Sequence, residues 1–180
     1  MKLEPPSVVA WLMRSQSRQV SEIRRSGITM AHLLAPQPPN PEIPIFFNVD
    51  QVVGQPPASN LREDIILVQF LYVALGPHLV RDLDLKNAAM QVRCTGVMDQ
   101  ATLTAIKVHQ QSLRLQNPGV VVDGRVSPAK GYNYGGITWL IVVLNEAVQH
   151  YYLDIWPRID QIPGCPNEIW GLVIRTVQGI

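Results

Sequence analysis

The same eight-residue pattern occurs twice in this chain, over residues 95–102 and 123–130. In each copy a glycine in the second position permits a positive φ, which few other residues adopt, and an apolar residue in the fourth can enter a core. The fifth position holds Asp99 in one copy and Ser127 in the other, and both residue types cap helices. Each copy therefore predicts a turn that leads the backbone into a helix.

The residues from 61 to about 75 predict a first helix, with Asn60 as its N-cap and Glu63 closing a capping box three residues later. Nearly every residue of this stretch is apolar, which indicates a central helix buried on all sides. Gly76-Pro77 is expected to end it.

Two further helices are predicted after this one. The second is expected to begin after Asp99 and to run to about Leu115, because its apolar residues recur every three or four positions along one face. The third contains the apolar run from Trp139 to Val148, and Thr138 is its expected N-cap. Three helices joined by two matched turns indicate a compact bundle.

The segments between the helices carry weaker patterns. Residues 45–49 predict a short extended segment. Residues 78–97 indicate a short helix and a small strand, and residues 120–126 are either a short strand or an extended lead into the second turn.

Two extensions flank the predicted core. Residues 1–44 contain a candidate helix over about 7–25 and then a proline-rich stretch, which cannot be helical because each proline removes a donor and restricts φ. Residues 151–180 are interrupted by prolines and end in an apolar pattern that fits a helix or a strand. The chain thus divides into an arm at 1–44, a core domain at 45–150 and an extension at 151–180, and we expect both extensions to contact other protein subunits.

The composition limits the kind of partner. Of 180 residues, 47% are hydrophobic and only 16% charged, which is little charge for a free monomer, so part of the apolar surface is expected to meet another chain. The net charge of +1 argues against nucleic acid as a partner. No apolar run approaches the roughly 18 residues of a membrane span, and the first residues do not resemble a secretory signal. We therefore expect synthesis in the cytoplasm and a place in a particle or an envelope-associated complex.

No motif for catalysis or metal binding occurs in the sequence. It has no nucleophile elbow, phosphate loop or zinc-helix motif, and its four histidines lack metal-ligand spacing. His109 is expected to be a hydrogen-bonded histidine of the core. Cys94 and Cys165 could form a disulfide, two buried thiols or one exposed thiol. The sequence predicts a protein that is not an enzyme and needs no cofactor or metal.

A series of short motifs lies in a fixed order between about residues 60 and 147. In chain order they are Val68-Gln69-Phe70-Leu71, Gly96 with Thr102, Ala105-Ile106, His109-Gln110, Val122-Asp123-Gly124, and Thr138-Trp139 with Leu144. This order resembles the peptidoglycan-binding-domain-like family, a three-helix module of many cell-wall hydrolases. The resemblance implies a mainly α fold with a compact three-helix bundle, to which the sequence adds an extended N-terminal arm and a C-terminal extension. Thr95 stands where the family's first turn has an aspartate.

Most of the matching residues are interpreted as structural. An aspartate beside a glycine fixes a turn, and a glutamine can satisfy backbone groups of a nearby loop. The predicted structural residues are Gln69, Gly96, Asp99, Thr102, Gln110, Asp123, Gly124, Thr138 and Trp139. The resemblance places a shallow sugar-peptide groove near the turns, so the candidate ligand contacts are Arg125, Tyr132, Asn133 and Tyr134. The alternative for these loop residues is a plain linker.

Two functions fit these observations. The first is a non-catalytic peptidoglycan-binding-like module that serves as a structural or attachment component of a larger assembly, with peptidoglycan as a partner beside the other subunits. The second is a purely structural subunit of a phage-tail or contractile-injection-like particle, without wall binding. Both are expectations based on the motifs and on the two extensions.

Overall fold

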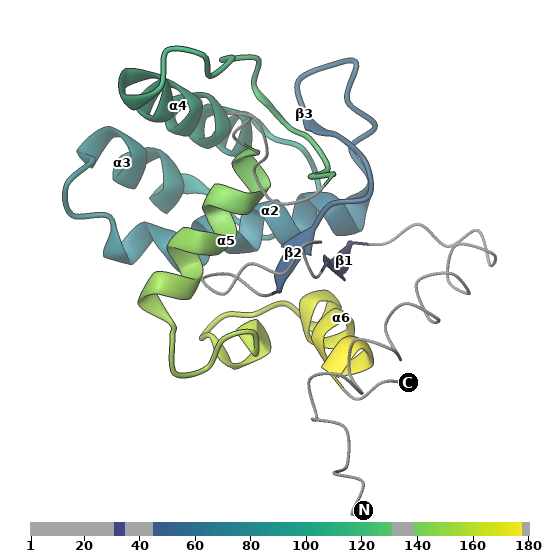
Figure 1. Ribbon diagram of the computed structural model, residues 1–180. Helices are drawn as coiled ribbons and strands as arrows, with labels where there is room; N and C mark the ends of the chain where they lie inside the picture. Colours follow the sequence, from purple (N-terminus) through teal and green to yellow (C-terminus); the bar gives the residue numbers. More distant parts are fainter. Residues whose placement is uncertain (1–30, 35–44, 131–138, 178–180) are drawn as a thin grey trace, which may run out of the picture.

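The computed structural model describes residues 31–34, 45–130 and 139–177. Within these ranges the protein is mainly helical (Figure 1). Its α-helices are α2 (Arg62–Leu75), α3 (Leu83–Gln91), α4 (Gln100–Gln116), α5 (Leu140–Tyr151) and α6 (Asn167–Val177). A 3₁₀ turn, η1 (Gly76–His78), follows α2, and a second one, η2 (Ile159–Gln161), precedes α6. The predicted helix over 7–25, the proline-rich stretch 36–44, the loop 131–136 and Thr138 lie outside the described residues.

In the described part of the chain, four short strands form two antiparallel pairs. Strand β1 (His32–Leu34) pairs with β2 (Phe46–Asn48) in one sheet, and β3 (Val53–Gly54) pairs with β4 (Arg125–Val126) in the other. The extended segment predicted at 45–49 is confirmed by β2. Of the two alternatives for residues 120–126, a strand forms at its last two positions, where Val126 lies opposite Val53.

Helix α2 is the centre of the fold, as its apolar sequence predicts. Ile65 through Tyr72 are all buried, and Phe70, Leu71 and Tyr72 expose no surface. Helices α3, α5 and α6 and strand β3 all contact it, and α5 crosses it in Figure 1. A helix that is apolar all round has no face left for water, so its neighbours must cover every side.

The predicted capping box at the start of α2 is wrong. The N-cap position is Leu61, which makes no side-chain cap bond. Asn60 adopts a φ of 52°, and its side-chain amide accepts from the N–H of Gly54 at 2.7 Å and donates to the C=O of Gly54 at 3.0 Å. Asparagine tolerates this left-handed backbone, and its amide pairs with Gly54 as a neighbouring strand would.

Helices α3 and α4 begin with aspartate caps. Asp99 accepts from the N–H of Thr102 at 2.7 Å, and Asp82 accepts from the N–H of Leu85 at 2.9 Å. The short helix predicted within 78–97 is therefore present as α3. The small strand expected in the same segment does not form, because residues 92–97 fold into the turn that precedes α4.

The second copy of the repeated pattern does not lead into a helix, contrary to the prediction. Its third and fourth residues form β4, and no helix begins after Ser127 in the described residues up to 130. Ala129 is held outside any helix because its N–H and C=O both pair with the side chain of Asn48, at 3.0 Å each. The first copy begins a helix and the second closes a sheet.

The third predicted helix is present as α5. Its N-cap position is Trp139, which makes no side-chain cap bond, so the prediction of Thr138 as the N-cap is wrong. Of the two alternatives for the C-terminal pattern, the helix forms, as α6. Cys94 and Cys165 are free and half-buried. Among the described helices, none has the length and apolar character needed to cross a membrane.

Replacing Gly124 by valine tests the second turn. Gly124 has a φ of +68°, where a β-branched residue costs about 1–3 kcal/mol, and an added Cβ would lie 2.8 Å from Lys107 Cε. We expect the melting temperature of Gly124→Val to fall by about 2–4 °C for each kcal/mol lost. Gly164→Val is the matched control and should lose less, because Gly164 has a φ of +82° with no atom within 4 Å of an added Cβ. An unchanged melting temperature for Gly124→Val would contradict the turn geometry.

Candidate functional site

The two repeated turns share one geometry. Gly96 and Gly124 both have a φ of +68°, and a buried glutamine from a helix reaches each turn. Gln69 comes from α2 and Gln110 from α4. The repetition in the sequence therefore corresponds to a repeated structure, in which a glutamine side chain binds the backbone of a turn that contains a glycine of positive φ. We call each such set of hydrogen bonds a clamp.

The residue before each glycine also plays the same part in both turns. Thr95 Oγ1 accepts from the N–H of Val97 at 3.2 Å, and Asp123 Oδ1 accepts from the N–H of Arg125 at 3.0 Å. The threonine hydroxyl of the first turn therefore takes the place that the carboxylate has in the second, since either oxygen accepts from the backbone two residues on.

Gln69 uses both ends of its side-chain amide. Its Oε1 accepts from the N–H groups of Thr95 and Gly96, both at 2.9 Å. Its Nε2 donates to the C=O of Val97 and to the hydroxyl of Thr102, both at 3.0 Å. The side chain is fully buried, so these bonds satisfy groups that water does not reach.

Gln110 holds the second turn in the same way. Its Oε1 accepts from the N–H of Gly124 at 2.8 Å, and its Nε2 donates at 2.9 Å to both the C=O of Arg125 and Asp123 Oδ1. The carboxylate of Asp123 is thereby oriented by a buried side chain. Its other oxygen, Oδ2, lies 3.8 Å from Arg125 Nε.

A groove of about 330 Å³ opens beside this second turn. It lies between the C-terminal end of α4, the chain directly after that helix and the first residues of α5. The lining residues are Gln110, Leu113, Asn117, Gly119, Val120, Val121, Asp123, Arg125, Ser127, Trp139 and Leu140. The volume is at the lower end of the range for small-ligand sites.

Arg125 and Asp123 are the charged groups in the lining. Their side chains are 36% and 33% exposed, so both are only partly hydrated. Arg125 Nε is shielded from solvent and makes no hydrogen bond within the described part of the chain. The groove therefore presents a partly exposed guanidinium beside a fixed carboxylate, and the two charges balance.

The remaining lining groups can stack or hydrogen-bond. Trp139 is half-buried and contributes an indole, and Asn117 is exposed and carries an amide whose oxygen accepts from the N–H of Gly119 at 3.1 Å. The structure thus brings the predicted contact Arg125 together with Trp139, which the sequence had suggested only as structural. Tyr132, Asn133 and Tyr134 lie outside the described residues. Asn117 was not expected, and its Asn-Pro-Gly context in the sequence signals only a turn.

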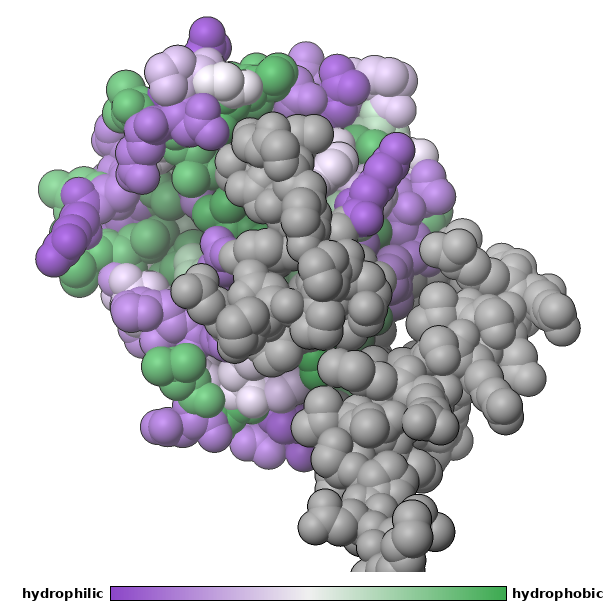
Figure 2. All heavy atoms as spheres, viewed as in Figure 1, coloured by the Kyte–Doolittle hydropathy of each residue, from purple (hydrophilic) through white to green (hydrophobic). Residues whose placement is uncertain are grey.

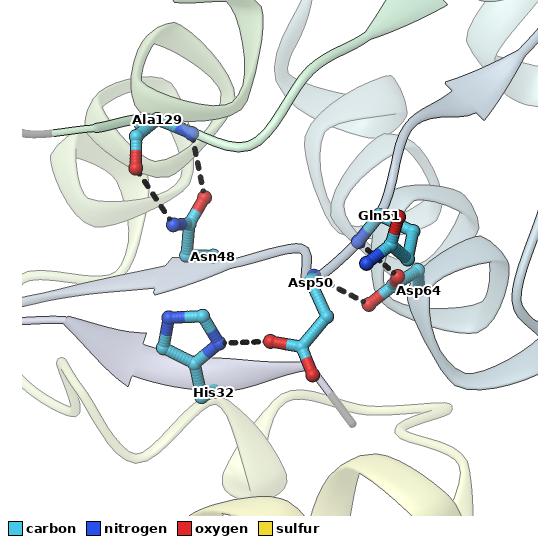
Figure 3. A network of polar contacts seen from close by, with 6 residues as sticks. All are labelled: His32, Asn48, Asp50, Gln51, Asp64 and Ala129. Atoms are coloured by element: carbon cyan, nitrogen blue, oxygen red, sulfur yellow. Dashed lines mark hydrogen bonds and ion pairs between the residues drawn. The ribbon is translucent and has the colours of Figure 1, made fainter. Parts of the chain in front are cut away.

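A second polar cluster joins β1, β2 and the start of α2 (Figure 3). His32 Nδ1 lies 2.5 Å from Asp50 Oδ1. The carboxylate of Asp64 accepts from the N–H of Asp50 at 3.0 Å and from that of Gln51 at 2.8 Å. Burial raises the pKa of Asp64 to about 6, against the opposing effect of these two hydrogen bonds. Both oxygens of Asp64 are occupied by backbone, which indicates that this carboxylate anchors the 50–51 turn.

His109 lies in the core against Tyr72, with Nδ1 at 3.4 Å from the tyrosine hydroxyl. Burial lowers the pKa of His109 to about 4, with Asp82 acting in the opposite direction. The expected hydrogen-bonded core histidine is therefore present. Over the ranges that the structure describes, no group of three or more histidine, cysteine, aspartate or glutamate side chains could hold a metal ion.

Comparison with known proteins adds no further constraint. No family model, no curated protein and no solved structure matches this chain. A functional proposal therefore rests on the groove, on the two glutamine-held turns and on the surface of the molecule.

Proposed function

We propose that this chain is a non-catalytic peptidoglycan-binding-like module that serves as a structural or attachment component of a larger assembly. Helices α2, α4 and α5 would correspond to the three helices of that module, although α4 packs mainly against α3, and no cofactor or metal takes part. The observation that carries the proposal is the groove in which Arg125, Asp123 and Trp139 meet beside the second turn.

The chemistry of the groove favours a neutral polar ligand. Arg125 Nε and Asp123 Oδ2 lie 3.8 Å apart, so the local charge is balanced and a strongly charged ligand gains little. Hydroxyl and amide groups of a glycan or its peptide can donate to Asp123 and accept from Arg125 at the same time. The indole of Trp139 can pack against the apolar face of a sugar ring. These are the groups that peptidoglycan presents.

The clamps support the family resemblance. The motif order that resembles the peptidoglycan-binding-like family contains both glutamines and both turn glycines, and each pair is joined by hydrogen bonds of 2.8–2.9 Å. A scaffold held in this way keeps Asp123 and the backbone of Arg125 in place without using their outward-facing atoms. The same scaffold would serve a purely structural subunit, so the ligand must be tested directly.

A pull-down on purified peptidoglycan sacculi tests the proposal. We expect the full chain to be retained, and we expect Arg125→Ala and Trp139→Ala each to reduce retention about tenfold, because arginine and aromatic side chains are typical dominant contacts. Arg114→Ala is the matched control, since this exposed arginine lies outside the groove. Melting curves establish that each variant is folded.

Retention of the parent chain no better than that of an unrelated protein would reject wall binding. The alternative, a purely structural subunit of a phage-tail or contractile-injection-like particle, would then stand. It is favoured by the low charge content and the two extensions, 1–44 and 151–180, which we propose contact other subunits. In either case we propose that the chain is made in the cytoplasm and acts in a particle or an envelope-associated complex.

A further inference from the structure

Cys94 and Cys165 are far apart in the sequence, but the fold brings their segments together. Cys94 directly precedes the first turn, and Cys165 lies two residues before α6 begins. Arg62 of α2 touches both segments, since its Nη1 donates to the C=O of Thr95 at 3.5 Å and its Nη2 to Glu168 Oε1 at 3.0 Å. A guanidinium is small and planar, so the residue after Cys94 and the first turn of α6 lie within the reach of one side-chain end.

The ionisation of the two thiols shows the same proximity. Burial and the carboxylate of Glu168 raise the pKa of Cys94 to about 11. Burial, the carboxylate of Asp160 and the thiol of Cys94 raise the pKa of Cys165 to about 12. Neighbouring charges act on a pKa mainly over short distances. Cys94 therefore lies close both to the start of α6 and to Cys165 itself.

The surroundings of both cysteines hold them in place and leave their sulfurs accessible. Each is half-buried and packs against the hydrophobic core. The backbone after Cys94 is fixed by the bond from the N–H of Thr95 to Gln69 Oε1, and the N–H of Cys165 donates to the C=O of Ile162 at 3.1 Å. The Sγ of Cys165 makes one weak local contact, at 3.5 Å to the C=O of Pro166. Two thiols held in this way are arranged for a bond to each other.

We propose that Cys94 and Cys165 are a modification site, at which a disulfide joins the first turn to the start of α6 when the protein meets a small-molecule disulfide. The Cys94 sulfur gives up its proton and attacks this oxidant, which releases one thiol. The Cys165 sulfur then attacks the Cys94 sulfur of the mixed disulfide and releases the second thiol. The two protons and two electrons leave with the released thiols, so one disulfide replaces another. In a reducing compartment the pair stays as the two free thiols that the structure has.

The bond would tie the 151–180 extension covalently to the core domain. It would also close a long loop, which stabilises a fold mainly by restricting the unfolded chain. The surface formed by α3 and α4, where Figure 2 shows exposed hydrophobic residues, lies on the other side of α2 from α6 (Figure 1) and takes no part. This inference goes beyond the proposed function and does not depend on wall binding.

Refolding of the full chain in a buffer of reduced and oxidised glutathione tests the pair. Refolding is used because buried thiols of raised pKa react slowly in the folded state. We expect the mass of the product to fall by two hydrogens and no thiol to react with a maleimide after unfolding. The melting temperature of the oxidised chain should exceed that of the chain kept in dithiothreitol by roughly 5–15 °C.

Cys94→Ser and Cys165→Ser are the matched controls. Neither should lose two hydrogens, and each should melt at the same temperature in both buffers. If one of them fails to fold, alanine replaces the serine, and the mass of the parent needs no variant. A parent that keeps two reactive thiols, carries glutathione on either cysteine or forms disulfide-linked dimers would overturn the proposal, as would an oxidised parent that melts no higher than the reduced one. The sacculus pull-down is independent of these outcomes.

Discussion

Gln69→Leu is expected to lower the free energy of unfolding by about 3–5 kcal/mol. Leucine has nearly the same volume but leaves the N–H of Gly96 and the hydroxyl of Thr102 without the partners that Gln69 provides, and both residues are buried. It also removes the bonds to the N–H of Thr95 and the C=O of Val97. Because unfolding free energies are typically 5–15 kcal/mol, such a loss brings the domain close to instability. Urea unfolding followed by circular dichroism measures it.

The matched control is Gln111→Leu, the same change at an exposed position of α4. It should alter the free energy of unfolding by less than about 0.5 kcal/mol. Gln110→Leu should fall between the two, since Gln110 holds three groups of its turn and Gln69 holds four at 3.0 Å or less. A Gln69→Leu variant as stable as Gln111→Leu would show that the clamp contributes nothing.

The repeated sequence pattern predicts both turns correctly, but it predicts only one of the two elements that follow them. Glycine in the second position indicates a positive φ, which the structure has at both Gly96 and Gly124. The start of α4 could also be predicted, because the carboxylate of Asp99 caps the helix by accepting from the N–H of Thr102, only three residues later. The strand β4 before Ser127 could not be predicted in the same way, since it depends on pairing with β3, more than 70 residues earlier in the chain. Local chemistry is readable from local sequence, and strand pairing is not.

Two asparagine side chains pair with backbone groups in the way that a neighbouring strand would. The sequence alone does not predict these contacts. Asn145 of α5 accepts from the N–H of Phe47 at 2.7 Å and donates to its C=O at 2.9 Å, across 98 positions. Asn48 forms the same two-bond pair with Ala129 across 81 positions. Both asparagines are buried, and each satisfies backbone that the short sheets leave unpaired. From the sequence alone, an asparagine is assigned to a turn or a helix cap before any such long-range pairing is considered. The prediction of Asn60 as an N-cap was wrong for this reason, since its amide pairs with Gly54.

The sequence likewise predicts only part of the candidate site. Arg125 comes directly after the turn motif, whereas Asn117 and Trp139 enter the groove from the ends of α4 and α5. Their meeting depends on how those helices pack. A sequence motif can therefore identify the residues on one side of a groove, whereas those on the opposite side become known only from the packing of the helices.

The acid stability of the protein is expected to reflect two buried groups with opposite effects. The pKa of Asp64 is raised to about 6, above 3.8 in the unfolded chain, so the folded state binds a proton more readily and gains stability as the pH falls from 6 to 3.8. The pKa of His109 is lowered to about 4, below 6.5 when unfolded, so the unfolded state binds the proton and stability is lost as the pH falls from 6.5 to 4. Each effect is worth about 3 kcal/mol, and together they nearly cancel.

Single substitutions should separate the two effects. We expect Asp64→Asn to lose about 3 kcal/mol more than the parent between pH 6.5 and 4, because only the penalty from His109 remains. His109→Gln should change in the opposite direction by a similar amount. The groups that act on Asp64 are Asp50 and His32, and Asp82 acts on His109. Both variants keep these neighbours, so the background titration is shared. Urea unfolding at several pH values measures each slope, and a variant slope equal to that of the parent would show that its residue does not titrate in this range. The double variant should regain a slope close to that of the parent, because it removes both opposing contributions.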